Sequence, residues 1–210
     1  MKYLFIAAHP DDEVLGCGAT MARLSEEGHE LFVQYLSDNT LRHGVKNALK
    51  KYADASAKVL GVSEWWCAQI PDQSMWKYQG HVVAMVEAAV KRCQPDVVFT
   101  HSRKDLNNDH QLCHDATLIA TRSHKSKADV VAYSVAGSGF GQEIAAPRLY
   151  VPVTEGQLIK KLTALGSFEL ETMEAPHPRS IGAVRAQAVV TGSQVMADYA
   201  ESFDIVRSIW

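Results

Sequence analysis

The residues best suited to chemistry lie near the start of the chain, in the sequence Ala8-His9-Pro10-Asp11-Asp12-Glu13. They follow an apolar run, Tyr3–Ala8, that predicts a buried strand, and they open an amphipathic pattern that predicts a helix. The carboxyl end of such a strand is where α/β proteins place their ligands. One capping side chain satisfies a strand-to-helix turn. A turn with an imidazole and two aspartates therefore carries more polar groups than folding requires, which indicates a function.

The spacing of these groups suits a metal ion. His9 and Asp12 are three positions apart across the turn, so their side chains can meet at one point while Asp11 points elsewhere. A catalytic zinc usually takes three protein ligands and leaves a position for water. A second polar cluster, Thr100–His110, begins where another predicted parallel strand ends, and His110 would complete a His-Asp-His set. A metal so held lowers the pKa of bound water, and Asp11, spared from ligation, can take the proton.

Each of these residues also has an ordinary structural interpretation. Asp11 or Asp12 alone is more often a helix cap or a first-turn carboxylate favoured by the helix dipole. A lone His101 or His110 is more often a structural imidazole. His114 follows His110 by four positions on a predicted helix, so a His110/His114 metal pair is an alternative ligand set. Two clusters that both mix histidine with aspartate after strands favour the functional interpretation.

Two further features are candidate binding elements. The glycines at positions 16 and 18 lie inside the helix pattern, and neither phosphate-loop motif, GxGxxG or GxxxxGK[ST], is present. We therefore interpret these two glycines as small residues that let the helix approach the sheet closely, and not as a nucleotide-binding loop. Trp76 follows Pro71-Asp72-Gln73-Ser74. It is a core residue by default, and the alternative is that it lines a pocket and stacks on a sugar face.

The order of the predicted elements indicates the fold class. β-rich runs alternate with helical patterns, which is typical of βαβ units around a mainly parallel sheet. Gly28 and Gly61 end the first two helices as C′ glycines do. We therefore expect an α/β fold, a Rossmann-like three-layer sandwich with a small C-terminal elaboration. The predicted strands are 3–8, 30–36, 65–68, 96–100, 130–134, 148–153 and 202–207, and the predicted helices are 14–27, 45–60, 79–93, 111–121, 157–165 and 181–199.

Length and composition exclude several classes of protein. At 210 residues the chain fits a single domain over 1–210. A net charge of −3 with no long Lys/Arg cluster argues against nucleic acid or an anionic membrane as a partner. No apolar segment approaches the ~20 residues of a membrane span, and the N-terminal run is too short for a secretory signal. The four cysteines lack a CxxC pair, so we expect reduced thiols in a cytoplasmic protein.

The two clusters resemble the motifs of a known family. The turn at residues 8–13 resembles the signature of the PIG-L/LmbE-like de-N-acetylases, and Asp105-Leu106-Asn107-Asn108-Asp109-His110 resembles that family's second motif. The resemblance extends over nearly the whole chain. Its other parts are 61–62, 70–73, 91–100, 116–122, 177–180 and 192–194.

This resemblance implies a Rossmann-like fold with one zinc ion per chain. It also implies hydrolysis of the acetamide of an N-acetylated amino sugar, such as an N-acetylglucosamine conjugate, to acetate and the free amine. The partner is then a small-molecule amino-sugar substrate. By position, the matches are His9, Asp12 and His110 to the zinc ligands, Asp11 to the general base, Arg42 to a substrate-binding arginine, and Asp109 to an aspartate that orients a catalytic histidine.

One departure from the family pattern concerns proton delivery. Some members have a histidine three residues before the last zinc ligand, and this chain has Asn107 there. Asparagine can donate a hydrogen bond to an oxyanion but cannot deliver a proton. We expect an imidazole from another segment, His177 in preference to His101, to protonate the leaving amine, with Asp11 as the alternative acid.

Two competing functions and the choice of sugar are left open by the sequence. The chain could hold a sugar nucleotide without hydrolysing it, or it could be a metallohydrolase of another amide or ester. The glycine-rich segment 136–146 and the surroundings of Trp76 are expected to select the sugar. The oligomeric state, including a homo-oligomer, is also left open.

Overall fold

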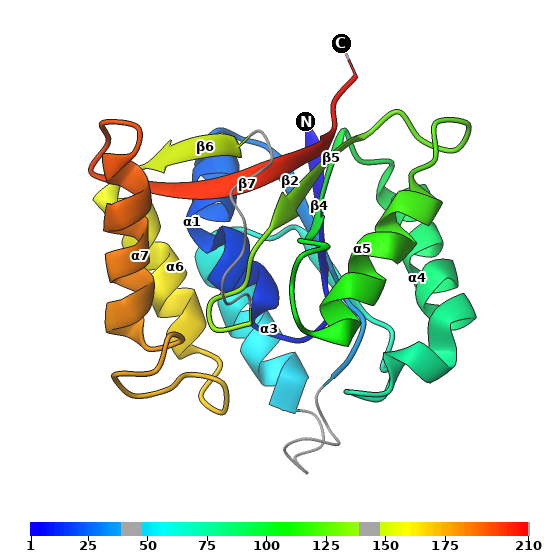
Figure 1. Ribbon diagram of the computed structural model, residues 1–210, viewed down its shortest axis with the longest axis horizontal. Helices are drawn as coiled ribbons and strands as arrows, with labels where there is room; N and C mark the ends of the chain where they lie inside the picture. The colour runs from blue at the N-terminus through cyan, green and yellow to red at the C-terminus, as the bar shows by residue number, and fades with distance from the viewer. Residues whose placement is uncertain (39–47, 139–147, 210) are drawn as a thin grey trace.

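A computed structural model of the chain describes residues 1–38, 48–138 and 148–209 (Figure 1). These residues form one seven-stranded sheet in the order β3-β2-β1-β4-β5-β7-β6. The first five strands in this order are parallel to their neighbours, and β7 runs antiparallel to both β5 and β6. The strands are β1 Lys2–Ala7, β2 Glu30–Tyr35, β3 Glu64–Cys67, β4 Val97–His101, β5 Asp129–Tyr133, β6 Arg148–Val153 and β7 Tyr199–Arg207.

Helices cover both faces of the sheet, which confirms the expected three-layer α/β sandwich (Figure 1). In β1, Leu4 and Ile6 pack with α4 and α5, whereas Phe5 and Ala7 pack on the other face with α1, α6 and α7. Alternating side chains of a strand point to opposite faces, so a strand between two helical layers is apolar throughout. The helices are α1 Asp12–Glu26, α3 Ala48–Leu60, the 3-10 helix η1 Met75–Tyr78, α4 Gln79–Cys93, α5 Asn108–Ala120, α6 Glu155–Gly166 and α7 Ile181–Ser193.

The last helix is shorter than the sequence pattern predicts. α7 ends at Ser193, and β7 begins at Tyr199, where the pattern still favoured helix. A Cβ on Gly192 would lie 2.6 Å from the carbonyl oxygen of Ala197 and 2.8 Å from Tyr199 Cα. The chain therefore folds back tightly against the helix end, which only glycine allows.

The glycines of α1 bring that helix close to its neighbours. A Cβ on Gly16 would lie 2.2 Å from Cδ2 of Tyr133 in β5, and one on Gly18 would lie 2.9 Å from Cγ of Lys161 in α6. This confirms the prediction that small residues here serve close packing. No helix in the described ranges combines the length and apolar character needed to cross a bilayer.

Candidate metal centre and active site

The turn between β1 and α1 holds three of the predicted site residues. His9, Asp11 and Asp12 are all buried, with exposed fractions of 6 %, 1 % and 0 %. Asp12 Oδ2 accepts a hydrogen bond of 2.8 Å from the backbone N–H of His9, which folds the turn back on itself. Asp11 occupies the N-cap position at φ 109°, yet its side chain makes no capping hydrogen bond. Its carboxylate is therefore not used as a helix cap, and its strained backbone is of the kind that clusters at functional sites.

Helix α5 brings His110 to the same point. β4 pairs directly with β1, so α5, which follows β4, begins beside the β1–α1 turn. Nε2 of His110 lies 3.3 Å from Nδ1 of His9 and 3.3 Å from Oδ2 of Asp12. The structure thus brings together three predicted residues that lie up to 101 positions apart.

Three overlapping groups of side chains could hold a metal ion. In each group one ligand atom per residue lies within 4.8 Å of the others. His9 belongs to two of the groups and His110 to two. The groups are His9/Asp12/His110, His101/Asp105/His110 and His9/Asp72/Asp109.

The hydrogen bonds of these side chains distinguish the groups. Asp12 Oδ1 is buried and has no hydrogen-bond partner among the described residues. In contrast, Asp105 accepts from the Asn107 N–H with Oδ1 and from the Ser138 hydroxyl with Oδ2. His101 Nε2 already accepts a 3.0 Å bond from the Ala8 N–H. A neutral imidazole has one acceptor nitrogen, so the lone pair that His101 would offer to a metal is occupied.

In His9 and His110, the ring nitrogen that faces away from the other imidazole lies next to carboxylates. His110 Nδ1 lies 2.8 Å from Asp105 Oδ2. His9 Nε2 lies 2.9 Å from Asp72 Oδ1 and 3.3 Å from Asp109 Oδ2, and Asp109 also accepts the backbone N–H of Gln73 at 2.9 Å. Carboxylates in these positions fix the tautomer and orientation of metal-binding imidazoles.

The mutual pKa shifts show how tightly these groups interact. Burial alone would raise the pKa of Asp12, but the imidazoles of His110, His101 and His9 outweigh it and hold the pKa well below its usual range. Burial also opposes protonation of His110, yet Asp12 and Asp105 raise its pKa to about 9. The cluster thus concentrates negative potential where its ring nitrogens converge, which suits a cation.

Asp11 faces a partner that the sequence did not indicate. Arg179 Nη1 lies 3.2 Å from Asp11 Oδ2, and Arg179 Nε donates to the Ala136 carbonyl at 3.4 Å. Burial and the neighbouring Asp12 raise the pKa of Asp11 well above its ordinary value, whereas the Arg179 guanidinium lowers it. The carboxylate is thus buried beside the candidate metal ligands and contacted by an arginine.

His101 is a second buried imidazole next to these residues. Its ring stacks on that of His110 with centroids 4.0 Å apart, and its Nε2 lies 3.2 Å from the Tyr133 hydroxyl. Burial, followed by the nearby His110, lowers the pKa of His101 well below its ordinary value. The neutral His101 ring accepts a hydrogen bond from the Ala8 N–H and so helps to fix the start of the β1–α1 turn.

The other predicted residues lie in less central places. Asn107 caps α5 and accepts the Asp109 N–H at 2.9 Å. His177 is exposed, and its Nδ1 accepts the Arg179 N–H at 3.1 Å. Trp76 is 59 % exposed, with Lys77 Nζ 5.2 Å from its ring centroid. Arg42 lies outside the described residues.

The alternative metal pair of His110 and His114 is not assembled. His114 Nδ1 lies 2.8 Å from the carbonyl oxygen of His101. It belongs to none of the candidate metal groups found among the described residues. Asp72, Asp105 and Arg179 were assigned no role from the sequence. All three belonged to quoted motif segments. The partners of Asp72 and Arg179 are distant in the chain, so spacing gave no indication of them, whereas Asp105 lies five positions before its partner His110 and could have been found from the motif.

Comparison with known proteins agrees with this arrangement. Residues 4–121, more than half of the chain, match the PIG-L family, described as GlcNAc-PI de-N-acetylase. The uncharacterized deacetylase YaiS of Escherichia coli K12 is 28% identical over 127 residues, which cover 57% of this chain and 68% of that protein.

Solved structures share the fold over almost the full chain. The conserved protein TT1542 of Thermus thermophilus superposes with a TM-score of 0.80 at 22% identity, covering 99% of this chain and 96% of that one. The N,N′-diacetylchitobiose deacetylase of Pyrococcus horikoshii gives 0.79 at 20% identity, covering 98% and 83%. GalB, the 4-carboxy-2-hydroxymuconate hydratase of Pseudomonas putida KT2440, gives 0.82 at 22% identity, covering 100% and 98%.

The presence of a hydratase among these structures means that the fold alone does not define the reaction. The match over residues 4–121 includes both polar clusters that converge in the structure, the β1–α1 turn and the start of α5. The chain belongs to the PIG-L family of de-N-acetylases.

Proposed function

We propose that this protein is a zinc-dependent N-deacetylase that hydrolyses the acetamide of an N-acetylated amino sugar to acetate and the free amine. The observation that carries the proposal is the convergence of His9, Asp12 and His110 beside the buried carboxylate of Asp11. Two imidazoles and one carboxylate form the ligand set of many catalytic zinc sites, with a position left for water. The proposal takes residues 1–210 as one deacetylase domain.

The residues present fit a zinc ion. Asp12 Oδ1 is a buried acceptor that folding leaves unused, and it belongs to the carboxylate whose Oδ2 lies 3.3 Å from both His9 Nδ1 and His110 Nε2. We assign His9, Asp12 and His110 as the ligands. Asp105 and the pair Asp72/Asp109 then hold the far sides of the two rings. When bound, such an ion lowers the pKa of a water toward neutrality and polarises the amide carbonyl.

We assign the proton transfers to Asp11. As a base it removes a proton from the attacking water, and its buried position makes it a strong acceptor. Arg179 orients its Oδ2 and favours the ionised form. The protonated carboxyl then delivers the proton to the amine as the carbon–nitrogen bond breaks. Asn107 contributes a side-chain N–H donor near the start of α5, since its oxygen is used by the helix cap.

The role suggested for His177 stays a prediction. Its side chain is exposed, and the same segment reaches Asp11 through Arg179. The pH profile of His177→Gln decides between the two acids. An altered alkaline limb assigns the leaving-group proton to His177, and an unchanged limb assigns it to Asp11. Asp109 is assigned to orient His9, and Arg42 and Trp76 are assigned to the substrate.

The substrate class rests on the family and on solved relatives. The family is described as acting on a GlcNAc conjugate, and one structural neighbour is a diacetylchitobiose deacetylase. We therefore propose a small-molecule amino-sugar substrate. We place the protein in the cytoplasm, because its four cysteines are free thiols and three of them are buried.

The test combines metal analysis with product analysis. The purified protein is assayed for zinc content and for acetate release from N-acetylglucosamine, N,N′-diacetylchitobiose and N-acetylglucosamine conjugates. Stoichiometric zinc with acetate release supports the proposal. Binding of a sugar nucleotide without acetate release indicates a binding protein, and release of phosphate instead of acetate indicates an esterase. Either result overturns the proposed function.

A further inference from the structure

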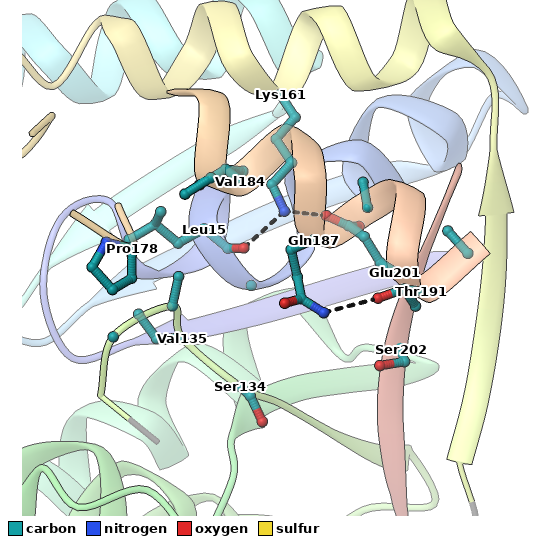
Figure 2. Close-up of a pocket in the computed structure, with 16 residues that line it drawn as sticks. Leu15, Ser134, Val135, Lys161, Pro178, Val184, Gln187, Thr191, Glu201 and Ser202 are labelled. Atoms are coloured by element: carbon teal, nitrogen blue, oxygen red, sulfur yellow. Dashed lines mark hydrogen bonds and ion pairs between the residues drawn. The ribbon is translucent and has the colours of Figure 1, made fainter. Parts of the chain in front are cut away.

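A cavity of about 390 Å³ lies beside the site, between α7, β7, the start of α1 and the segment after β5 (Figure 2). Its volume falls within the range of about 300–1,000 Å³ typical of small-molecule sites. Among the described residues that line it are Leu15, Val135, Lys161, Val184, Ala188 and Glu201. The mechanism proposed above uses none of them.

A buried ion pair borders the cavity. Lys161 Nζ lies 2.5 Å from Glu201 Oε1 and donates to the Leu15 carbonyl at 2.8 Å, and both charged side chains are about nineteen-twentieths buried (Figure 2). Glu201 also accepts the backbone N–H groups of Ala19 and Thr20. The carboxylate is therefore satisfied. An ammonium has three N–H donors, and acceptors among the described residues occupy two of them.

The charge of the cavity favours a neutral ligand. Lys161 and Glu201 compensate each other, so a charged group would be desolvated here without a counter-ion, at high cost. The remaining polar groups are hydroxyls and an amide, such as Thr191 and Gln187, whose side chains hydrogen-bond to each other at 3.3 Å (Figure 2). Such groups both donate and accept.

The other walls are small and apolar. Val184 and Ala188 of α7 face the cavity with Leu15 of α1 and Val135 of the segment after β5. On α7 these apolar residues alternate with the hydrogen-bonding Gln187 and Thr191. A lining that mixes apolar and hydrogen-bonding groups suits a ring with C–H faces and hydroxyl edges. Hydrophobic lining with a few placed polar groups is the general pattern of small-molecule sites.

Two of the residues that line the cavity link it to Asp11. Pro178 lines the cavity (Figure 2), and the next residue, Arg179, contacts Asp11 at 3.2 Å. Leu15, whose carbonyl accepts from Lys161, donates its own N–H to the Asp11 carbonyl at 2.9 Å. A group in the cavity therefore contacts Leu15, which hydrogen-bonds to Asp11, and Pro178, which is adjacent to Arg179.

We propose that this cavity binds a neutral, hydroxylated ring of about the size of one sugar unit. The ring could belong to the substrate, as the unit attached to the N-acetylated sugar, or to a free saccharide. The first source rests on the proposed function, and the second does not.

The test fills the cavity without touching Asp11 or the metal group. Ala188→Leu places a larger side chain in the cavity, and Ala186→Leu makes the same change on the exposed face of the same helix. Thr191→Val removes a lining hydroxyl without adding bulk and serves if Ala188→Leu fails to fold by circular dichroism. KM is measured for N-acetylglucosamine and N,N′-diacetylchitobiose, and glucose binding is measured by saturation-transfer NMR.

We expect Ala188→Leu to raise KM for the disaccharide about tenfold and to leave KM for the monosaccharide unchanged, which identifies the ring as part of the substrate. Unchanged KM values with loss of the glucose signal in Ala188→Leu, but not in Ala186→Leu, identify a free saccharide. An equal effect on both sugars, or no effect in either measurement, overturns the proposal. If no N-acetylated sugar is hydrolysed, the proposed function fails, and the glucose measurement alone decides the cavity.

Discussion

Arg179 Nη1 lies 3.2 Å from Asp11 Oδ2, although the two residues are 168 positions apart in the chain. The Arg179 side chain is 15% exposed and comes from the segment before α7. It is a cation placed beside the carboxylate that we assign as the base. The C-terminal part of the fold, which lies outside the matched residues 4–121, therefore contributes a side chain to the proposed active site.

Asp11→Asn is expected to lower kcat by roughly 10²–10⁴-fold, because the variant keeps the shape of the side chain but cannot accept the proton. Zinc content should stay the same, since Asp11 is not one of the assigned ligands. Acetate release and metal analysis of the same preparation check both statements. Near-native turnover would remove Asp11 from the mechanism.

Arg179→Gln is expected to move the acidic limb of kcat/KM to higher pH. Burial raises the pKa of Asp11, and Arg179 opposes that effect, so loss of the guanidinium raises the pKa further. The base acts in its ionised form, so activity then falls at a higher pH on acidification. Arg185→Gln, on a half-exposed arginine of α7 that pairs with Glu155 of α6, is the matched control. An unshifted limb in Arg179→Gln would contradict the assignment.

Asp105→Asn is expected to weaken zinc binding by roughly 10–100-fold, because the carboxylate that orients His110 through Nδ1 is lost. Competition with a chelator measures the affinity. Asp115→Asn, a change on the same helix as His110 at a half-exposed carboxylate paired with Arg103, should leave the affinity unaltered. Equal affinities in the two variants would show that Asp105 does not support the metal.

Gly16→Ala is expected to destabilise the protein by about 1–3 kcal/mol, the usual cost of overpacking. The new Cβ would lie 2.2 Å from Tyr133 Cδ2, so α1 or the ring must move. Gly182→Ala is the control, because no atom lies within 4 Å of its added Cβ. Urea denaturation gives both free energies of unfolding, and a neutral Gly16→Ala would mean that the helix is less closely packed than described.

The sequence alone was sufficient to predict the order of the secondary-structure elements and the contacts within one turn. Period-2 and period-3.6 patterns predicted the order of strands and helices, and β6 and α4 have the predicted bounds. The spacing of His9 and Asp12 within one turn is set by a few backbone bonds, so the sequence could indicate their meeting. The rule that parallel strands end at one edge then brought His110 to them.

Only the tertiary structure decided contacts between segments that share no local pattern. The pairing of Arg179 with Asp11, of Asp72 with His9 and of Lys161 with Glu201 depends on how loops and the antiparallel β7 pack against the parallel sheet. The end of α7 was also decided there, because Gly192 packs against the backbone of Tyr199. Helix and strand periodicity reports which face of an element is buried, but it carries no information about which distant side chain that face will meet.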